Sequence, residues 1–79
     1  MIVSTADTIP GKKIVKTLGL VTAKSGWIFS NREEDARNNL EKNAEQLGAN
    51  AIIGYRSESV RSSFTPDYVR AYGTAVIVE

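Results

Sequence analysis

The segment 30–54, SNREEDARNNLEKNAEQLGANAIIG, predicts a capped helix that runs directly into an apolar strand. Ser30 is a good N-cap, and Glu33 stands three positions later, which is the spacing of a capping box. Glu34 and Asp35 place negative charge near the positive end of the helix dipole, and Gly48 supplies the left-handed conformation that ends many helices. We therefore expect the other segments to cover this helix-strand unit.

Small apolar residues form a stripe along the predicted helix. Ala36, Leu40, Ala44 and Leu47 recur at intervals of three and four, so we expect them to share one face. Two leucines and two alanines fill little volume. Such a helix can lie close to a sheet, but it cannot build a large core alone.

Length and composition favour a single domain over residues 1–79. A chain of this size buries only about 60 to 65% of the surface that it exposes when unfolded, so small domains need disulfides, metals or association. The chain has no Cys, which excludes disulfides, and it has neither Cys nor His to hold a structural zinc ion. Self-association is the remaining source of stability.

Charge and hydropathy limit the expected partners and location. Ten basic and nine acidic residues give a net charge of +1, which is too near balance to indicate nucleic acid or acidic lipid. Residues 1–7 contain no basic region followed by a long apolar run, and no stretch is long enough to span a bilayer. We expect a cytoplasmic protein without a nucleic-acid or membrane partner.

The N-terminal part predicts two strands. β-Branched residues indicate a short strand over 2–5 and a longer one over 13–24. Pro10 and Gly11 favour a turn that closes a hairpin between them. Gly19, in the middle of the second strand, indicates a bulge, a sharp bend or a neighbouring backbone at close range.

The C-terminal part predicts a second hairpin, with strands over 51–60 and 68–79 and a loop at 61–67. The whole order is then ββαββ. We expect an α+β fold in which the main helix packs on an antiparallel sheet.

The expected strand faces carry more apolar surface than one helix can cover. Strict alternation places Ala51, Ile53 and Tyr55 on one face of the third strand, and in the last strand Val76 and Val78 make the face away from the helix apolar. An antiparallel sheet with one wet face should alternate apolar with polar residues. We expect a neighbouring subunit to cover the second face.

Four motifs carry a resemblance that extends over nearly the whole chain. They are IPGKKIV at 9–15, LGLV at 18–21, LGANAIIG at 47–54 and YGTAVIV at 72–78. Together they resemble the YbjQ-like family, which carries the label putative heavy-metal-binding. The resemblance implies a small dodecin-like or YbjQ-like subunit that assembles into a ring, commonly a pentamer.

The chain differs from this family in the connection between the second predicted strand and the main helix. Members of the family are longer and carry an inserted helical stretch between the second strand and the main helix, whereas here residues 26–29 make a short connection. Any function that resides in the insertion would be missing.

Acidic residues give the metal candidates, and these are weak. Soft heavy metals favour thiolate and imidazole ligands, and the chain has neither. Glu33, Glu34 and Asp35 could bind a hard cation through oxygen. Consecutive helical residues point in different directions, so the three cannot converge within one subunit, and complementarity to the helix dipole explains them better. Copies around a ring axis could still bring one of them together.

The interface candidates are aromatic, amide and valine side chains. Asn39 and Asn43 lie along one border of the apolar stripe, where they could bond across a subunit seam, line a pore or simply face water. The remaining candidates are Trp27, Phe29, Tyr72, Val76 and Val78. Trp27 could alternatively form a shelf for an aromatic ligand, although a core or subunit contact is favoured.

No residue pattern predicts a reaction or a cofactor. Without His or Cys, the remaining bases are carboxylates, Lys and Tyr, and no spacing pairs them with a nucleophile. We expect a homo-oligomeric binding or scaffolding module rather than an enzyme. The alternative is a ring-shaped protein that binds a cation or a small ligand.

Overall fold

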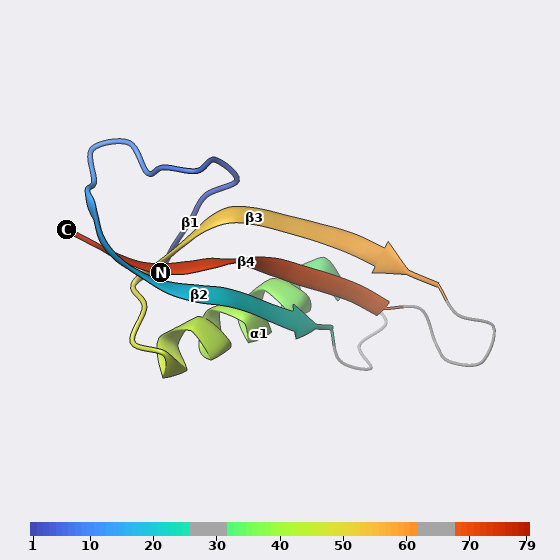
Figure 1. Cartoon of the computed structure of the whole chain (residues 1–79). Helices are drawn as coiled ribbons and strands as arrows, with labels where there is room; N and C mark the ends of the chain where they lie inside the picture. The colour runs from blue at the N-terminus through green and yellow to red at the C-terminus, as the bar shows by residue number, and fades with distance from the viewer. Residues whose placement is uncertain (26–31, 62–67) are drawn as a thin grey trace.

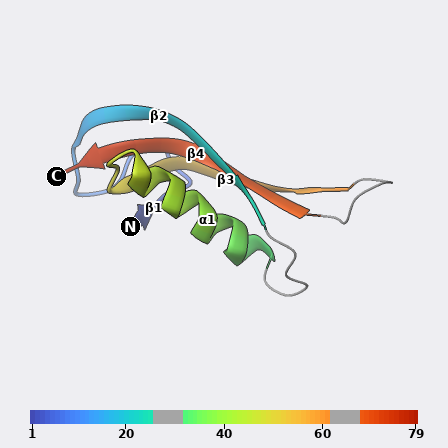
Figure 2. The ribbon, with the colours of Figure 1, turned by 90° about the horizontal axis from the view of Figure 1, so that it is seen from below.

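One helix lies along one face of a four-stranded sheet (Figures 1 and 2). The computed structural model describes residues 1–25, 32–61 and 68–79. Its elements are β1 (Ile2–Val3), β2 (Ile14–Lys24), α1 (Arg32–Gln46), β3 (Ala51–Val60) and β4 (Tyr68–Val78). The predicted ββαββ order and the α+β class are confirmed. In the described part of the chain, no helix is long and apolar enough to cross a membrane.

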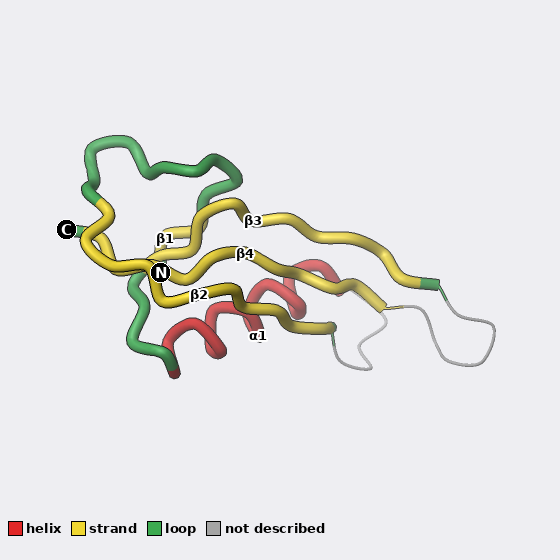
Figure 3. The backbone as a smooth tube through the Cα atoms, viewed as in Figure 1, coloured by secondary structure: helices red, strands yellow, loops and turns green. Residues whose placement is uncertain are grey.

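The sheet is mixed rather than wholly antiparallel. Its strand order is β1-β3-β4-β2, with β4 antiparallel to both neighbours and β1 parallel to β3. The expected hairpin between the first two strands is wrong, because β1 and β2 lie at opposite edges of the sheet. Pro10 and Gly11 do form a turn, in which Lys12 N–H donates to the carbonyl of Ile9, but the connection runs from one edge to the other (Figure 3).

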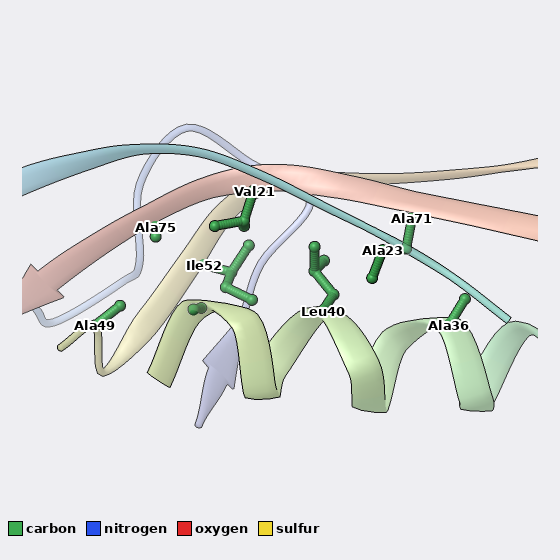
Figure 4. Close-up of a cluster of buried hydrophobic side chains, with 9 residues drawn as sticks. Val21, Ala23, Ala36, Leu40, Ala49, Ile52, Ala71 and Ala75 are labelled. Carbon is green, nitrogen blue, oxygen red and sulfur yellow. The ribbon is translucent and has the colours of Figure 1, made fainter. Parts of the chain in front are cut away.

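The core between helix and sheet is built largely from alanine. Leu40 of α1 and Ile52 of β3 are its largest fully buried side chains (Figure 4). The remaining buried members are Val21, Ala23, Ala36, Ala44, Ala49, Ala71 and Ala75. Small residues on both layers let the helix approach the sheet closely, but they bury few methylene groups, each worth about 0.8 kcal/mol.

The predicted helical stripe is confirmed at three of its four positions. Ala36, Leu40 and Ala44 are fully buried, whereas Leu47 is 51% exposed. The helix ends at Gln46. Leu47 N–H donates to the carbonyl of Ala44, three residues back, so the tighter final turn carries the Leu47 side chain off the buried face.

The sheet face away from α1, called the outer face below, is covered at one end by the same chain. The connection between β1 and β2 places Ile9 against Ala51, Val76 and Val78, and all four residues are buried. A neighbouring subunit was expected to cover Val76 and Val78, but within this chain Ile9 already buries them. A hairpin was expected around Pro10 and Gly11, but the connection that contains this turn instead crosses the apolar end of the sheet.

A bulge in β3 divides the outer face into two parts. Ile53 pairs with Thr74 and Arg56 with Tyr72, so two residues of β3 stand opposite Gly73. A Cβ atom at Gly73 would lie 2.6 Å from Ile52 Cγ2, so any larger residue there would require Ile52 or its strand to shift. The bulge also turns Tyr55 toward the helix side, where it packs against the core, so its predicted face is wrong.

The predicted irregularity at Gly19 is confirmed. The β2 register shifts between Thr17 and Gly19, and again between Ile14 and Lys16. Beyond Gly19, Val21 and Ala23 face the helix while Leu20 and Thr22 lie on the outer face.

Candidate functional site

The LGANA motif joins the helix to the sheet through a side-chain amide. Gly48 has a φ of +89°, and Ala49 N–H donates to the carbonyl of Ala44, which closes the helix. Asn50 then pairs with Val78 in both directions: Nδ2 donates to the carbonyl at 2.9 Å, and Val78 N–H donates to Oδ1 at 2.8 Å. The Asn50 amide thus extends the β3–β4 ladder by one pair. These helix-closing and strand-pairing contacts account for the LGANA motif in structural terms.

Asn39 and Asn43 hold the helix against the edge strand. Their Nδ2 atoms donate to the carbonyls of Lys24 and Thr22 respectively, each at 2.9 Å. Ser25 N–H donates inward to β4, and backbone groups alternate along a strand, so these two carbonyls lie on the outer edge of β2. Within this chain, the two amides bind an edge strand rather than simply facing water.

The acidic start of α1 borders a groove beside β3. The groove encloses about 500 Å³ and is lined by Glu33, Glu34, Arg37, Asn38, Glu41 and Tyr55. Glu33 accepts a hydrogen bond from Ser57 at 3.0 Å, and Arg37 lies 3.7 Å from Glu41. The Tyr55 hydroxyl is buried and has no hydrogen-bond partner among the residues that the structure describes. Among the described residues, no three side chains of a metal-ligating type gather.

A second groove lies on the outer face beyond the bulge. We call this part of the face the open half, and its groove of about 360 Å³ is lined by Leu20, Val21, Thr22, Glu58, Arg70 and Tyr72. Leu20 is 82% exposed and Tyr72 is 38% exposed. No segment of the described chain covers these two side chains as Ile9 covers the other end.

Charged and aromatic side chains border the open half. Arg70 donates from Nε and Nη2 to the same oxygen of Glu58. The Lys24 ammonium lies 5.1 Å from the centre of the Tyr68 ring, within the range of a cation–π contact. The hydrogen bond with Glu58, followed by the charge of that carboxylate, raises the pKa of Arg70 above its ordinary value. Arg70 therefore presents a permanent positive charge at this surface.

The structure brings only some of the predicted site residues together. Trp27 and Phe29, and the Ser30 cap, lie outside the described residues. Tyr72 is accessible, whereas Val76 and Val78 are not. Sequence reasoning missed Leu20, Glu58 and Arg70 as neighbours in one groove, because the bulge opposite Gly73 shifts β3 relative to β4. The glycines at 54 and 73 are the signal that could have indicated it.

Comparison with known proteins establishes the family. The family model described as putative heavy-metal-binding matches residues 27–79. The chain belongs to the YbjQ-like family. A UPF0145 protein of Methanocaldococcus jannaschii is 38% identical over 91 residues, covering all of this chain and 93% of that protein. A UPF0145 protein of Bacillus velezensis is 36% identical over 104 residues, with the same coverage. The names of these YbjQ-like relatives give no reaction.

A solved structure supports the fold of this YbjQ-like chain. A protein of unknown function from Pediococcus pentosaceus, assigned to the DUF74 family, superposes with a TM-score of 0.69 at 22% identity, covering all of this chain and 98% of that one. The sequence alignments extend over 91 and 104 residues, against 79 in this chain, so the relatives carry additional residues within the aligned region.

The donor atoms of the chain do not fit the metal named in the family description. Soft heavy metals bind thiolate, thioether and imidazole groups. The sequence has no Cys, no His and a single Met at position 1. The carboxylates of Glu33, Glu34 and Asp35 suit hard cations instead.

Proposed function

We propose that this YbjQ-like chain is a self-assembling binding or scaffolding module that forms a homo-oligomeric ring, most simply a pentamer, in the cytoplasm. The observation that carries the proposal is a pair of sheet edges without a strand alongside. In the described chain, no strand lies outside β2, although Asn39 and Asn43 bond two of its outward carbonyls. On β3, the backbone of residues 2–6 bonds the outer edge as far as Tyr55, so the uncovered part of that edge begins at Arg56. An uncovered edge is a template for pairing with another chain.

The two edges complement each other in direction. Both β2 and β3 run antiparallel to β4, so they run parallel to each other at opposite sides of the sheet. If β2 of one copy pairs with β3 of the next, the sheet continues with every helix on the same side. Such head-to-tail contacts form a ring when the rotation from one copy to the next closes. The alanine-rich core gives a further reason, because a small core gains stability from association.

Light scattering at micromolar concentration tests the assembly. We expect a mass about five times that of the 8.6 kDa chain. Val15 lies in β2 and is 46% exposed, so Val15→Lys should block edge pairing and lower the mass. Gln46→Lys, at the exposed end of α1, is the matched control and should keep it. A monomeric wild type would overturn the proposal, and an unchanged mass in Val15→Lys would overturn its edge-pairing part.

The groove beside α1 supports a second candidate, a ring that binds a hard cation or small ligand. Glu33, Glu34 and Glu41 line this groove of 500 Å³ without gathering at one point, so a cation there would need further ligands from a neighbouring copy. Because a ligand that binds only the native state raises the unfolding midpoint, a thermal-shift series with Ca, Mg, Zn, Cu and Ni tests this candidate. We expect Ca or Mg to raise the midpoint, and Glu34→Gln to reduce the effect. No shift with any ion would remove this candidate.

A further inference from the structure

The groove of the open half combines an apolar surface with charges of both signs. It is formed by side chains of β2, β3 and β4, and its 360 Å³ falls in the size range of small-ligand sites. The charge pattern and the aromatic ring define what would fit there.

Leu20 and Tyr72 form the apolar part. Thr22 pairs with Tyr72 across β2 and β4, so Leu20, two residues before Thr22, is the diagonal neighbour of Tyr72 on the same face. Both side chains are open to solvent. A planar ring laid across them would bury the most exposed leucine of the described chain and contact the tyrosine ring, and offset aromatic contacts add to simple burial.

Arg70 and Glu58 supply directional hydrogen bonds. Arginine has five N–H donors, and Arg70 uses its Nε and Nη2 atoms on a single Glu58 oxygen. Among the described residues, no hydrogen bond is made by Arg70 Nη1 or by the second carboxylate oxygen of Glu58. The pair can therefore accept a ligand anion at the guanidinium and a ligand N–H at the carboxylate. Both side chains are nearly half exposed, at 46% and 44%.

Lys24 adds a second positive charge beside Arg70. The two residues are direct partners across β2 and β4 and lie on the same face. Like charges directly opposite each other destabilise a strand pair. Glu58 offsets one of them, and Tyr68 contacts the other. An anion placed between Lys24 and Arg70 would remove the remaining repulsion.

We propose that the open half binds a small planar aromatic anion of the nucleotide class. The ring lies across Leu20 and Tyr72, the anionic group lies at Arg70 and Lys24, and an N–H group on the ring edge donates to Glu58. The site goes beyond self-association, because it uses the outer face whereas assembly uses the sheet edges. A net charge of +1 and a short groove favour a free mononucleotide over a nucleic-acid strand.

NMR titration of the full chain with adenosine monophosphate tests the site. We expect the largest amide shifts at Leu20, Arg70 and Tyr72, with binding in the millimolar range or tighter. Adenosine carries only the ring and inorganic phosphate carries only the anionic group. Each should therefore bind at least about tenfold more weakly than adenosine monophosphate. Phosphate that binds as tightly as the nucleotide would overturn the proposal, as would shifts confined to α1.

Matched variants separate the groove from general surface effects. Leu20→Ser and Arg70→Gln should each weaken nucleotide binding by at least about fivefold. Their controls are Leu47→Ser, an exposed leucine at the end of α1, and Arg37→Gln on the helix. Equal weakening in the controls would overturn the site.

A single-stranded oligonucleotide that binds more than about tenfold more tightly than the monophosphate would assign the surface to nucleic acid and overturn the small-ligand proposal. The NMR titration measures nucleotide binding whether the chain is a monomer or a ring. Absence of nucleotide binding is therefore a different outcome from absence of self-assembly.

Discussion

The two halves of the outer sheet face differ in what covers them. At one end, Ile9 lies over Ala51, Val76 and Val78, and all four side chains are buried. Beyond the bulge, Leu20 and Tyr72 are open to solvent in the same sheet. The strands are continuous from one half to the other, so the difference comes from the connection between β1 and β2, which crosses only one end (Figure 3).

This difference shows that the same alternating pattern can serve two purposes. In the covered half, apolar residues on the outer face add a second small core to a chain whose main core is mostly alanine. In the open half, apolar residues are mixed with an Arg70–Glu58 pair and Lys24. A surface of that composition is suited to contact with another molecule, because exposed apolar patches rimmed by polar groups mark interaction sites.

The largest expected difference is between Val76→Asp and Leu20→Asp. Val76 is fully buried, so an aspartate there would be an unpaired charge in the covered half, and we expect a loss above about 4 kcal/mol in the free energy of unfolding. Leu20 is 82% exposed, so its substitution should stay within about 0.5 kcal/mol. Chemical denaturation followed by circular dichroism measures both. Similar losses would show that the open half is covered in solution.

A smaller effect is expected for Ile9→Ala. This change keeps the connection but removes most of the side chain that covers Val76, and we expect a loss of about 2–3 kcal/mol, as for other large-to-small changes at buried sites. The matched change in the open half is Tyr72→Ala, which should cost far less because Tyr72 has no cover in the described chain. The same denaturation experiment compares them. Equal losses would mean that Ile9 is not the cover.

Much of the fold could be predicted from local signals, and apart from Leu47 at the end of the helix the errors concern how the strands pair and what covers them. Capping residues, glycines and alternation identified the helix, the four strands and the irregularity at Gly19. They did not predict that β1 would pair with β3, because strand propensity says nothing about which neighbour a strand finds. The cover of Val76 and Val78 within the chain was missed for the same reason, since the covering residue, Ile9, lies more than sixty positions away in the sequence.

The open half was harder to predict than the fold. Its residues come from three strands, and their alignment depends on the β3 bulge. Sequence reasoning argued against nucleic acid and acidic lipid because the net charge of +1 is near balance. Alternation along β4 does place Arg70 and Tyr72 on one face. The contact of Lys24 with Tyr68 and the position of Leu20 in the same groove depend on how β2 pairs with β4, which no spacing rule on a single strand would indicate.

The sharpest test of the boundary between the halves is Gly73→Ala, for which we expect a smaller loss in the free energy of unfolding than for Ile9→Ala. The added Cβ atom would lie 2.6 Å from Ile52 Cγ2 and 3.1 Å from the carbonyl oxygen of Ile53, so β3 must shift locally. Overpacking of this kind costs about 1–3 kcal/mol, and we expect the lower part of that range because the bulge can adjust. Gly19→Ala is the control, since its Cβ would meet nothing within 4 Å although its φ of +130° adds backbone strain.

The decisive measurement on Gly73→Ala is the change in amide chemical shifts. Gly73→Ala should move the signals of Arg56 and Glu58, which follow the bulge, and leave those of Ile9 and Val78 in place. If instead the covered half moves and the open half does not, the bulge does not separate them, and the pairing of Glu58 with Arg70 must arise independently of Gly73.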